Sequence, residues 1–213
     1  MTPETPVPAP RRVNSRTSGS LAAVLGECRG MPADKALRYL RLRVWRRLGL
    51  RSDRSILRRL KPESVLFVCH GNILRSPMAA ELFRTRMTDR GGAIGSLSAG
   101  LWAVNGRPAD PRAIAAARKF GVSLAPHLSR SVSDTLVARS DLICVMDYRN
   151  ELDVITRFRG AARKTILLGA MDAEASGNPQ ISDPVSLSVE GVERCYARLA
   201  SAVDGLVEAL GFD

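Results

Sequence analysis

The segment that decides the fold runs Val65-Leu66-Phe67-Val68-Cys69-His70-Gly71-Asn72-Ile73-Leu74-Arg75-Ser76-Pro77. Its first four residues favour β structure and are all apolar, which predicts a buried strand over residues 64–68. Proline is common at the first helical position, so a helix is predicted to begin at Pro77. The loop between them can turn successive backbone N–H groups inward, and the helix dipole adds positive potential. The segment therefore predicts a concave site for an oxyanion the size of phosphate.

Cys69 and Arg75 frame this loop with the spacing C-x5-R. Arginine carries a planar fork that matches phosphate oxygens, so Arg75 is predicted to close the site. A thiol at the base of such a loop would be held as a nucleophilic thiolate. The spacing alone also fits a buried cysteine beside a surface arginine. Strand, loop, Ser-Pro and helix in succession favour phosphoryl transfer through Cys69.

Beyond this segment, apolar stretches alternate with helical patterns. Strands are predicted at residues 64–68, 94–98, 142–145 and 165–168. Helices are predicted at residues 77–90, 111–120, 133–138, 148–158 and 191–210, with Asp110 as an N-cap before Pro111. The alternation predicts an α/β fold, a doubly wound four-stranded parallel sheet flanked by helices. In such folds ligands bind beyond the carboxyl ends of the strands, where Cys69 falls.

The positive charge is concentrated at the start of the chain. The 213 residues carry a formal net charge of +11. Residues 1–60 contain 14 Lys+Arg and 4 Asp+Glu, whereas residues 61–213 contain 18 and 17. Three regions follow: a disordered tail at 1–20, rich in Pro, Ser, Thr and Arg; a basic, amphipathic helical extension at 21–60; and a catalytic domain at 61–213.

The extension contains an apolar row at helical spacing, formed by Leu37, Leu40, Val44 and Leu48. Such a helix can lie on an anionic membrane surface, grip an acidic partner, or pack on the catalytic domain with its basic face in solvent. The sequence leaves these alternatives open for residues 33–60. Nucleic acid is disfavoured, because only Tyr39 and Trp45 supply stacking surfaces.

Composition excludes several other classes. The four cysteines have unrelated spacings, which predicts neither a metal site nor a disulfide framework, and no cofactor is expected. A catalytic thiolate needs a reducing compartment. No apolar run reaches membrane-spanning length and no signal-peptide core precedes the domain. The expected location is the cytoplasm, with attachment to the membrane periphery as one alternative for the extension.

The loop resembles the signature of the low-molecular-weight protein tyrosine phosphatases, Val-Cys-x-Gly-Asn-x-x-Arg-Ser-Pro, which the chain carries from Val68 to Pro77. The resemblance covers about Lys61 to the C-terminus. It continues through Ser98-Ala99-Gly100, Pro108-Ala109-Asp110-Pro111-Arg112, His127-Leu128-Ser129-Arg130, Asp141-Leu142-Ile143, Met146-Asp147 and Asp183-Pro184. It implies a hydrolase that removes phosphate from phosphotyrosine in proteins.

This chemistry assigns roles to individual residues. Cys69 would form a phosphocysteine, Arg75 would bind the phosphate, and Asp183 would act as general acid and base, because its Asp-Pro matches the family's. Substrate contacts are expected from the loop and from one wall residue: Gly71, Asn72, Ile73, Leu74, Ser76 and Trp102. Ser76 can also donate to the thiolate or cap the helix, and Gly71 is expected to adopt a positive φ, which Asn72 tolerates. The resemblance further implies that Asn72, Ser98 and His127 form a network that stiffens the loop.

Three departures from the family pattern bear on specificity. Leu74 stands where many relatives have a second cysteine, and no aromatic residues follow Asp183-Pro184. Ile73 resembles the tyrosine-type pocket, since relatives that act on phosphoarginine have threonine there. The alternatives are an arsenate reductase, which needs a relay of further cysteines with one near the end of the third strand, where Asp147 stands, and a non-catalytic phosphate-binding or scaffolding protein. Asp147 is also the second candidate for the general acid.

Overall fold

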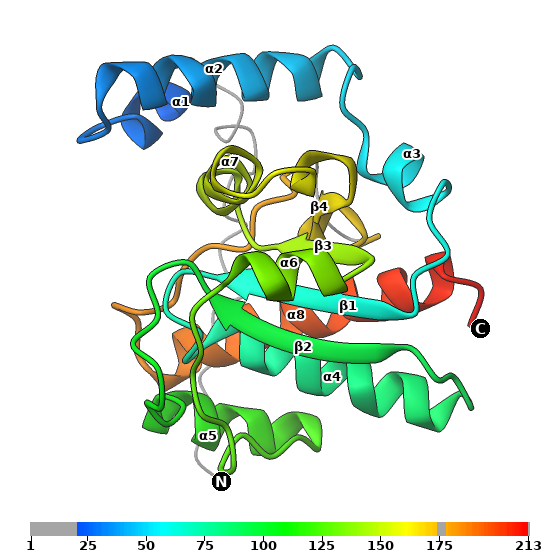
Figure 1. Ribbon diagram of the computed structural model, residues 1–213. Helices are drawn as coiled ribbons and strands as arrows, with labels where there is room; N and C mark the ends of the chain where they lie inside the picture. Colours follow the sequence, from blue (N-terminus) through cyan, green and yellow to red (C-terminus); the bar gives the residue numbers. More distant parts are fainter. Residues whose placement is uncertain (1–20, 174–177, 213) are drawn as a thin grey trace, which may run out of the picture.

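A computed structural model describes residues 21–173 and 178–212 of the chain. Its centre is one parallel sheet in the order β2-β1-β3-β4 (Figure 1). The strands are β1 (Ser64–Cys69), β2 (Gly95–Gly100), β3 (Leu142–Val145) and β4 (Thr165–Leu167). These are the four strands predicted from the sequence, and the fold class is confirmed. The predicted tail at residues 1–20 lies outside the described residues.

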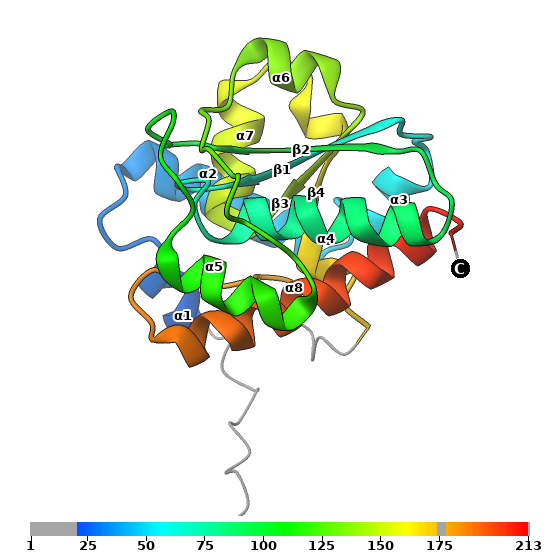
Figure 2. The ribbon, with the colours of Figure 1, turned by 90° about the horizontal axis from the view of Figure 1, so that it is seen from below.

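Helices cover both faces of the sheet, as a doubly wound fold requires. Figure 2 shows α4, α5 and α8 on one side of the strands, and α6 and α7 on the other. The bounds are α4 (Arg75–Asp89), α5 (Pro111–Ala117), α6 (Asp134–Arg139), α7 (Tyr148–Arg157) and α8 (Val189–Ala209). Short 3-10 turns are η2 (Arg118–Phe120), η3 (Ala161–Arg163) and η4 (Leu168–Ala170). Helix α4 begins two residues before Pro77, because proline is accommodated throughout a first helical turn.

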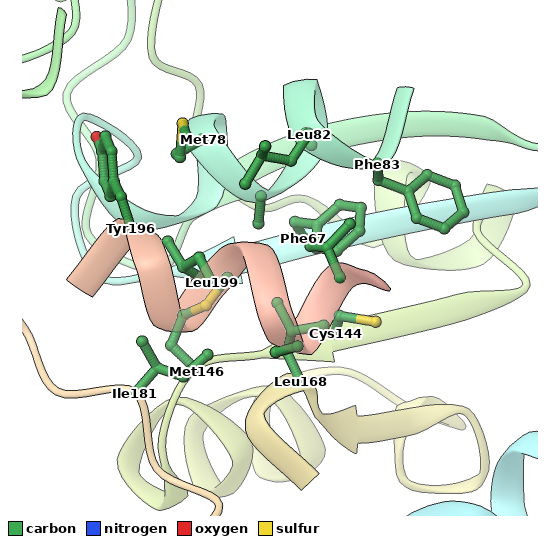
Figure 3. Packing of buried hydrophobic residues seen from close by; sticks show 14 of the residues in the cluster. Phe67, Met78, Leu82, Phe83, Cys144, Met146, Leu168, Ile181, Tyr196 and Leu199 are labelled. Atoms are coloured by element: carbon green, nitrogen blue, oxygen red, sulfur yellow. The ribbon is translucent and has the colours of Figure 1, made fainter. Parts of the chain in front are cut away.

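Successive side chains of β1 point to opposite faces and are buried on both, which explains its unbroken apolar run. Phe67 packs against Phe83 of α4, with ring centroids 5.6 Å apart, and Leu199 of α8 completes this layer (Figure 3). Leu66 and Val68 belong to the second core, beneath α6 and α7. This packing fixes the carboxyl end of β1, and with it the position of Cys69.

The extension forms three helices, α1 (Leu21–Glu27), α2 (Ala33–Arg47) and α3 (Asp53–Leu57). Helix α2 lies across α7, with Tyr39 and Leu42 buried beneath it (Figure 1). The helix packs on the domain, but not through the predicted row, because Leu37, Val44 and Leu48 are 69%, 53% and 66% exposed and only Leu40 is half-buried. No described helix is both long enough and apolar enough to cross a membrane.

Two basic side chains of α2, Lys35 and Arg46, face the domain because the domain presents carboxylates there. The Arg46 guanidinium donates to Glu151 of α7 at 2.7 Å and to Asp53 at 2.6 Å. Arg51 also binds Glu151, whose side chain is fully buried. Asp53 in turn accepts a bond of 2.9 Å from the Leu167 N–H of β4. The extension is therefore joined to the domain through a buried ionic network.

Candidate active site

The loop after β1 turns its carbonyl groups outward. The carbonyls that accept bonds from outside the loop include those of Cys69 from Leu101 N–H (3.0 Å), His70 from Trp102 N–H (2.9 Å), Ile73 from Asp110 N–H (3.0 Å) and Leu74 from the Tyr196 hydroxyl (3.0 Å). On the inner side of the loop, the Asn72 N–H donates to Cys69 Sγ at 3.3 Å. A main-chain donor is therefore directed at the thiol, as an anion-binding loop requires.

Asn72 supplies the tight turn of the loop, with a φ of +54°. The positive φ expected at Gly71 is wrong, since Asn72 alone makes the left-handed turn within the loop. The Asn72 side chain donates to Ser76 Oγ and to Ser98 Oγ, both at 2.9 Å, and accepts from the Arg130 N–H at 2.9 Å. The His127 Nε2 atom lies 2.7 Å from the Asn72 carbonyl. The structure therefore brings together the three predicted network residues.

Ser76 lies beside the thiol rather than at the helix cap. Its Oγ is 3.0 Å from Cys69 Sγ and 3.2 Å from the Ala99 carbonyl. The Ser76 hydroxyl carries one proton, and the Ala99 carbonyl and the sulfur both lie within reach of it; a thiolate at Cys69 would accept this proton. Leu74 occupies the N-cap position without a side-chain bond, so the cap role expected for Ser76 is wrong.

Gly100 allows the loop to lie against β2. It pairs with Cys69 across the parallel strands. A Cβ at position 100 would lie 2.7 Å from the His70 carbonyl oxygen and 2.8 Å from the Asn72 nitrogen. Both atoms belong to the phosphate loop backbone. Only glycine leaves room for the loop at its observed distance from the strand.

Arg75 is buried in the site, with 1% of its surface exposed. Its guanidinium donates to Asp147 at 2.8 Å, to the Ile181 carbonyl at 2.9 Å, and to Asp183. Burial opposes its charge, but Cys69, Asp147 and Asp183 together raise the pKa of Arg75. The cation is therefore permanent, and both candidate acids meet at it.

The two carboxylates differ in their surroundings. Asp147 also caps α7 through the Asn150 N–H at 2.7 Å, and its side chain is 19% exposed. Asp183 lies on the loop before α8, and its side chain is 36% exposed. Asp183 has the freer access to a leaving group at the mouth of the site.

Arg112 holds the loop that carries Asp183, a contact that sequence reasoning missed. It forms an ion pair with Asp110 at 2.7 Å, and this pairing lowers the pKa of Asp110. Its guanidinium also donates to the carbonyls of Val185 (3.1 Å) and Leu187 (2.6 Å). Asp110 caps α5 as predicted, but the sequence carries no signal that joins Arg112 to a loop more than seventy residues later.

The rim of the site is partly apolar. Trp102 is 59% exposed. Its ring centroid lies 6.5 Å from that of His70, and the Arg157 guanidinium lies 5.0 Å from the centre of the Trp102 ring. Ile73 is half-buried against the core, whereas the Leu74 side chain is only 3% exposed. Contacts of Leu74 with a phosphate group are thereby limited to its backbone N–H.

Comparison with known proteins agrees with this geometry. The family model of the "Low molecular weight phosphotyrosine protein phosphatase" matches residues 64–213. The chain is 35% identical to the "Probable low molecular weight protein-tyrosine-phosphatase AmsI" of Erwinia amylovora over 148 residues, which are 69% of this chain and 96% of that protein.

Solved structures give the same result. The tyrosine phosphatase Wzb from Escherichia coli K30, in complex with sulphate, aligns with a TM-score of 0.63 at 32% identity, over 70% of this chain and 99% of that one. The YwlE arginine phosphatase from Geobacillus stearothermophilus aligns with a TM-score of 0.61 at 28% identity, over 68% and 90%. The enzyme class predicted from the sequence is confirmed: the chain belongs to the low-molecular-weight phosphotyrosine protein phosphatase family.

Proposed function

We propose that the chain hydrolyses phosphotyrosine in proteins through a phosphocysteine intermediate. The single observation that carries this proposal is the setting of Cys69 Sγ, with Ser76 Oγ at 3.0 Å and the Asn72 N–H at 3.3 Å. A hydroxyl and an N–H within reach of sulfur can both donate to a thiolate and so stabilise it. N–H groups of the same loop would suit the equatorial oxygens of a phosphoryl group in transfer.

In the first step, Cys69 Sγ attacks phosphorus while the bond from phosphorus to the tyrosine oxygen breaks. Arg75 binds two non-bridging oxygens, and Asp183 gives its proton to the leaving phenoxide. In the second step, Asp183 takes a proton from water, the water oxygen bonds to phosphorus, and the thiolate leaves. Because phosphate competes with Asp183 for the Arg75 N–H groups, substrate binding releases Asp183 toward the leaving oxygen.

Phosphotyrosine suits the rim better than other phosphoryl groups. Trp102 would offer one aromatic wall for a phenyl ring, and the apolar Ile73 resembles the tyrosine-type pocket. Curated relatives such as AmsI carry a tyrosine-phosphatase name. An arsenate reductase is disfavoured, because Cys144 is buried within β3 and Asp147 follows that strand. The free cysteines suit a reducing compartment, so the cytoplasm is the proposed location.

The proposal is tested with Cys69→Ser and a phosphotyrosine peptide. We expect turnover to be abolished and inorganic phosphate still to bind, since the loop N–H groups and Arg75 remain. Residual turnover in Cys69→Ser would contradict the phosphocysteine route. A wild-type protein that binds phosphotyrosine peptide without cleaving it would favour the scaffolding alternative, and faster cleavage of a phosphoarginine peptide would reassign the substrate.

A further inference from the structure

The outer surface of α2 is more apolar than a helix at the surface of a domain normally is. Leu37, Val44 and Leu48 point away from the domain. Of the twelve large apolar side chains that are exposed among the described residues, six lie between Leu25 and Leu50. The helix has thus placed its ion-pairing side chains against the domain and its apolar row in solvent, so the row is available to a partner.

Basic side chains surround this row. Arg38, Arg41 and Arg47 are exposed on α2, and the Arg41 guanidinium lies 4.3 Å from the ring centre of Trp45. Residues 21–60 contain 11 Lys+Arg and 3 Asp+Glu, a net charge of +8. Two of the three acids, Glu27 and Asp53, are already paired with arginines within the extension. The third acid, Asp34, is exposed on the first turn of α2, so the charge around the row is predominantly, though not entirely, positive.

A basic cavity opens next to the row. It has a volume of about 750 Å³ and lies between α2, the start of α3 and the domain. Leu40 and Val44 form part of its apolar lining, and Arg47 and Arg54 are among its basic residues. Within the described residues, neither of these two guanidinium groups has an ion-pair partner. An anionic headgroup in this cavity would meet unpaired arginines, with an apolar surface alongside for its chain.

We propose that the outward face of α2 docks on an anionic phospholipid bilayer. Leu37, Val44 and Leu48 enter the interface, Trp45 lies at headgroup level, and the arginines contact lipid phosphates. A second copy of the chain fits less well, because paired rows would bring arginines of like charge together. Figure 1 shows α2 at the outer edge of the molecule, on the side of the sheet that α7 covers. Phosphorylated segments close to a membrane could then reach the site.

The test measures binding of the full-length protein to sedimented vesicles, either phosphatidylcholine alone or phosphatidylcholine mixed with phosphatidylglycerol. We expect binding only to the anionic vesicles, falling as salt rises. L37Q/V44Q/L48Q should weaken it by at least about tenfold. R47Q/R54Q should weaken it by roughly thirtyfold. All these side chains are exposed or line a cavity, so turnover of a small aryl phosphate should be unchanged and serves as the folding check.

Matched controls change similar residues elsewhere. Leu97→Gln alters an exposed leucine on β2, and R84Q/R118Q removes two exposed arginines from α4 and η2. Both controls should retain vesicle binding. Absence of wild-type binding, or equal binding by L37Q/V44Q/L48Q, would overturn the proposal. A third result would also overturn it: the wild type self-associates but binds no vesicles, and L37Q/V44Q/L48Q abolishes the self-association. The row would then serve as a contact with a second copy of the chain.

Discussion

The guanidinium of Arg112 reaches the main-chain carbonyl of Leu187 at 2.6 Å, and so ties the start of α5 to the loop that carries Asp183. The same arginine pairs with Asp110, whose N–H binds the Ile73 carbonyl in the phosphate loop. Arg112 thus connects the loop after β1 to the loop that carries Asp183. Under the proposed mechanism it is a positioning residue that does not itself touch the reacting atoms.

Arg112→Gln should therefore lower kcat by roughly tenfold to a hundredfold, because Asp183 loses its fixed distance to the leaving oxygen. KM should change little. The loss should shrink for aryl phosphates with acidic leaving groups, which need less protonation. Arg84→Gln is the control, because the one ion pair of Arg84 within the described residues is with Glu81, on an exposed helix face. Equal losses for all leaving groups would instead indicate a general structural role.

Asp183→Asn should reduce kcat by on the order of 10²–10⁴, since proton transfer to the phenoxide is lost. The Cys69 thiol should still react with an alkylating agent at its normal rate. Asp147→Asn provides the comparison, because both carboxylates bind Arg75. A nearly normal kcat in Asp183→Asn together with a severe loss in Asp147→Asn would transfer the acid role to Asp147.

Gly100→Ala should damage the phosphate loop without unfolding the domain. The new Cβ would lie under 3 Å from two backbone atoms of the loop, so the loop must shift. We expect weaker binding of inorganic phosphate and a kcat reduced about a hundredfold. Gly95→Ala, on the same strand, places its Cβ no closer than 3.6 Å to its nearest neighbour and should have normal kinetics.

Oxidation of Cys69 should be difficult to reverse. Leu74 provides no neighbouring thiol, and burial raises the pKa of Cys195 to about 12, so this group stays a weakly nucleophilic thiol at neutral pH. Burial also raises the pKa of Cys144. Peroxide should convert the sulfenic acid to irreversible forms, and dithiothreitol should restore little activity. The Leu74→Cys variant should regain more activity with dithiothreitol. Full recovery of the wild type would indicate that Cys195 forms a disulfide with oxidised Cys69.

Arg46→Met should lower the free energy of unfolding by about 3 kcal/mol or more, because it leaves buried Glu151 and Asp53 with fewer cations. Urea denaturation measures this change. Arg84→Met removes an exposed pair and should cost less than about 1 kcal/mol. Similar small losses in both variants would mean that water reaches Glu151.

The sequence predicted the parts of the fold that depend on local chemistry. The apolar run of β1 and the Asp110-Pro111 cap each have a local cause, and each was found as expected. The orientation of α2 could not be predicted in this way. Helical spacing identifies an apolar row but not its partner, and the inward turn depends on carboxylates of Glu151 and Asp153, more than a hundred residues away.

The same limit applies to the site. The loop from Cys69 to Arg75 is contiguous, so its spacing could be interpreted directly. The convergence of Asp147 and Asp183 on Arg75 joins segments that are 72 and 108 residues away from it. Ser76 shows a second limit. Whether it caps α4 or lies beside the thiol depends on the residue at which α4 begins, and α4 begins at Arg75 rather than at Pro77, the start predicted from the sequence.

The fully buried carboxylate of Glu151 also has an evolutionary consequence. Its countercharges come from Arg46 and Arg51, both in the extension. A homologue that lost this extension would have to change position 151 to an uncharged residue or recruit another cation to cover it. The residue at this one position of α7 should therefore record, across the family, which lineages have inherited the N-terminal helices.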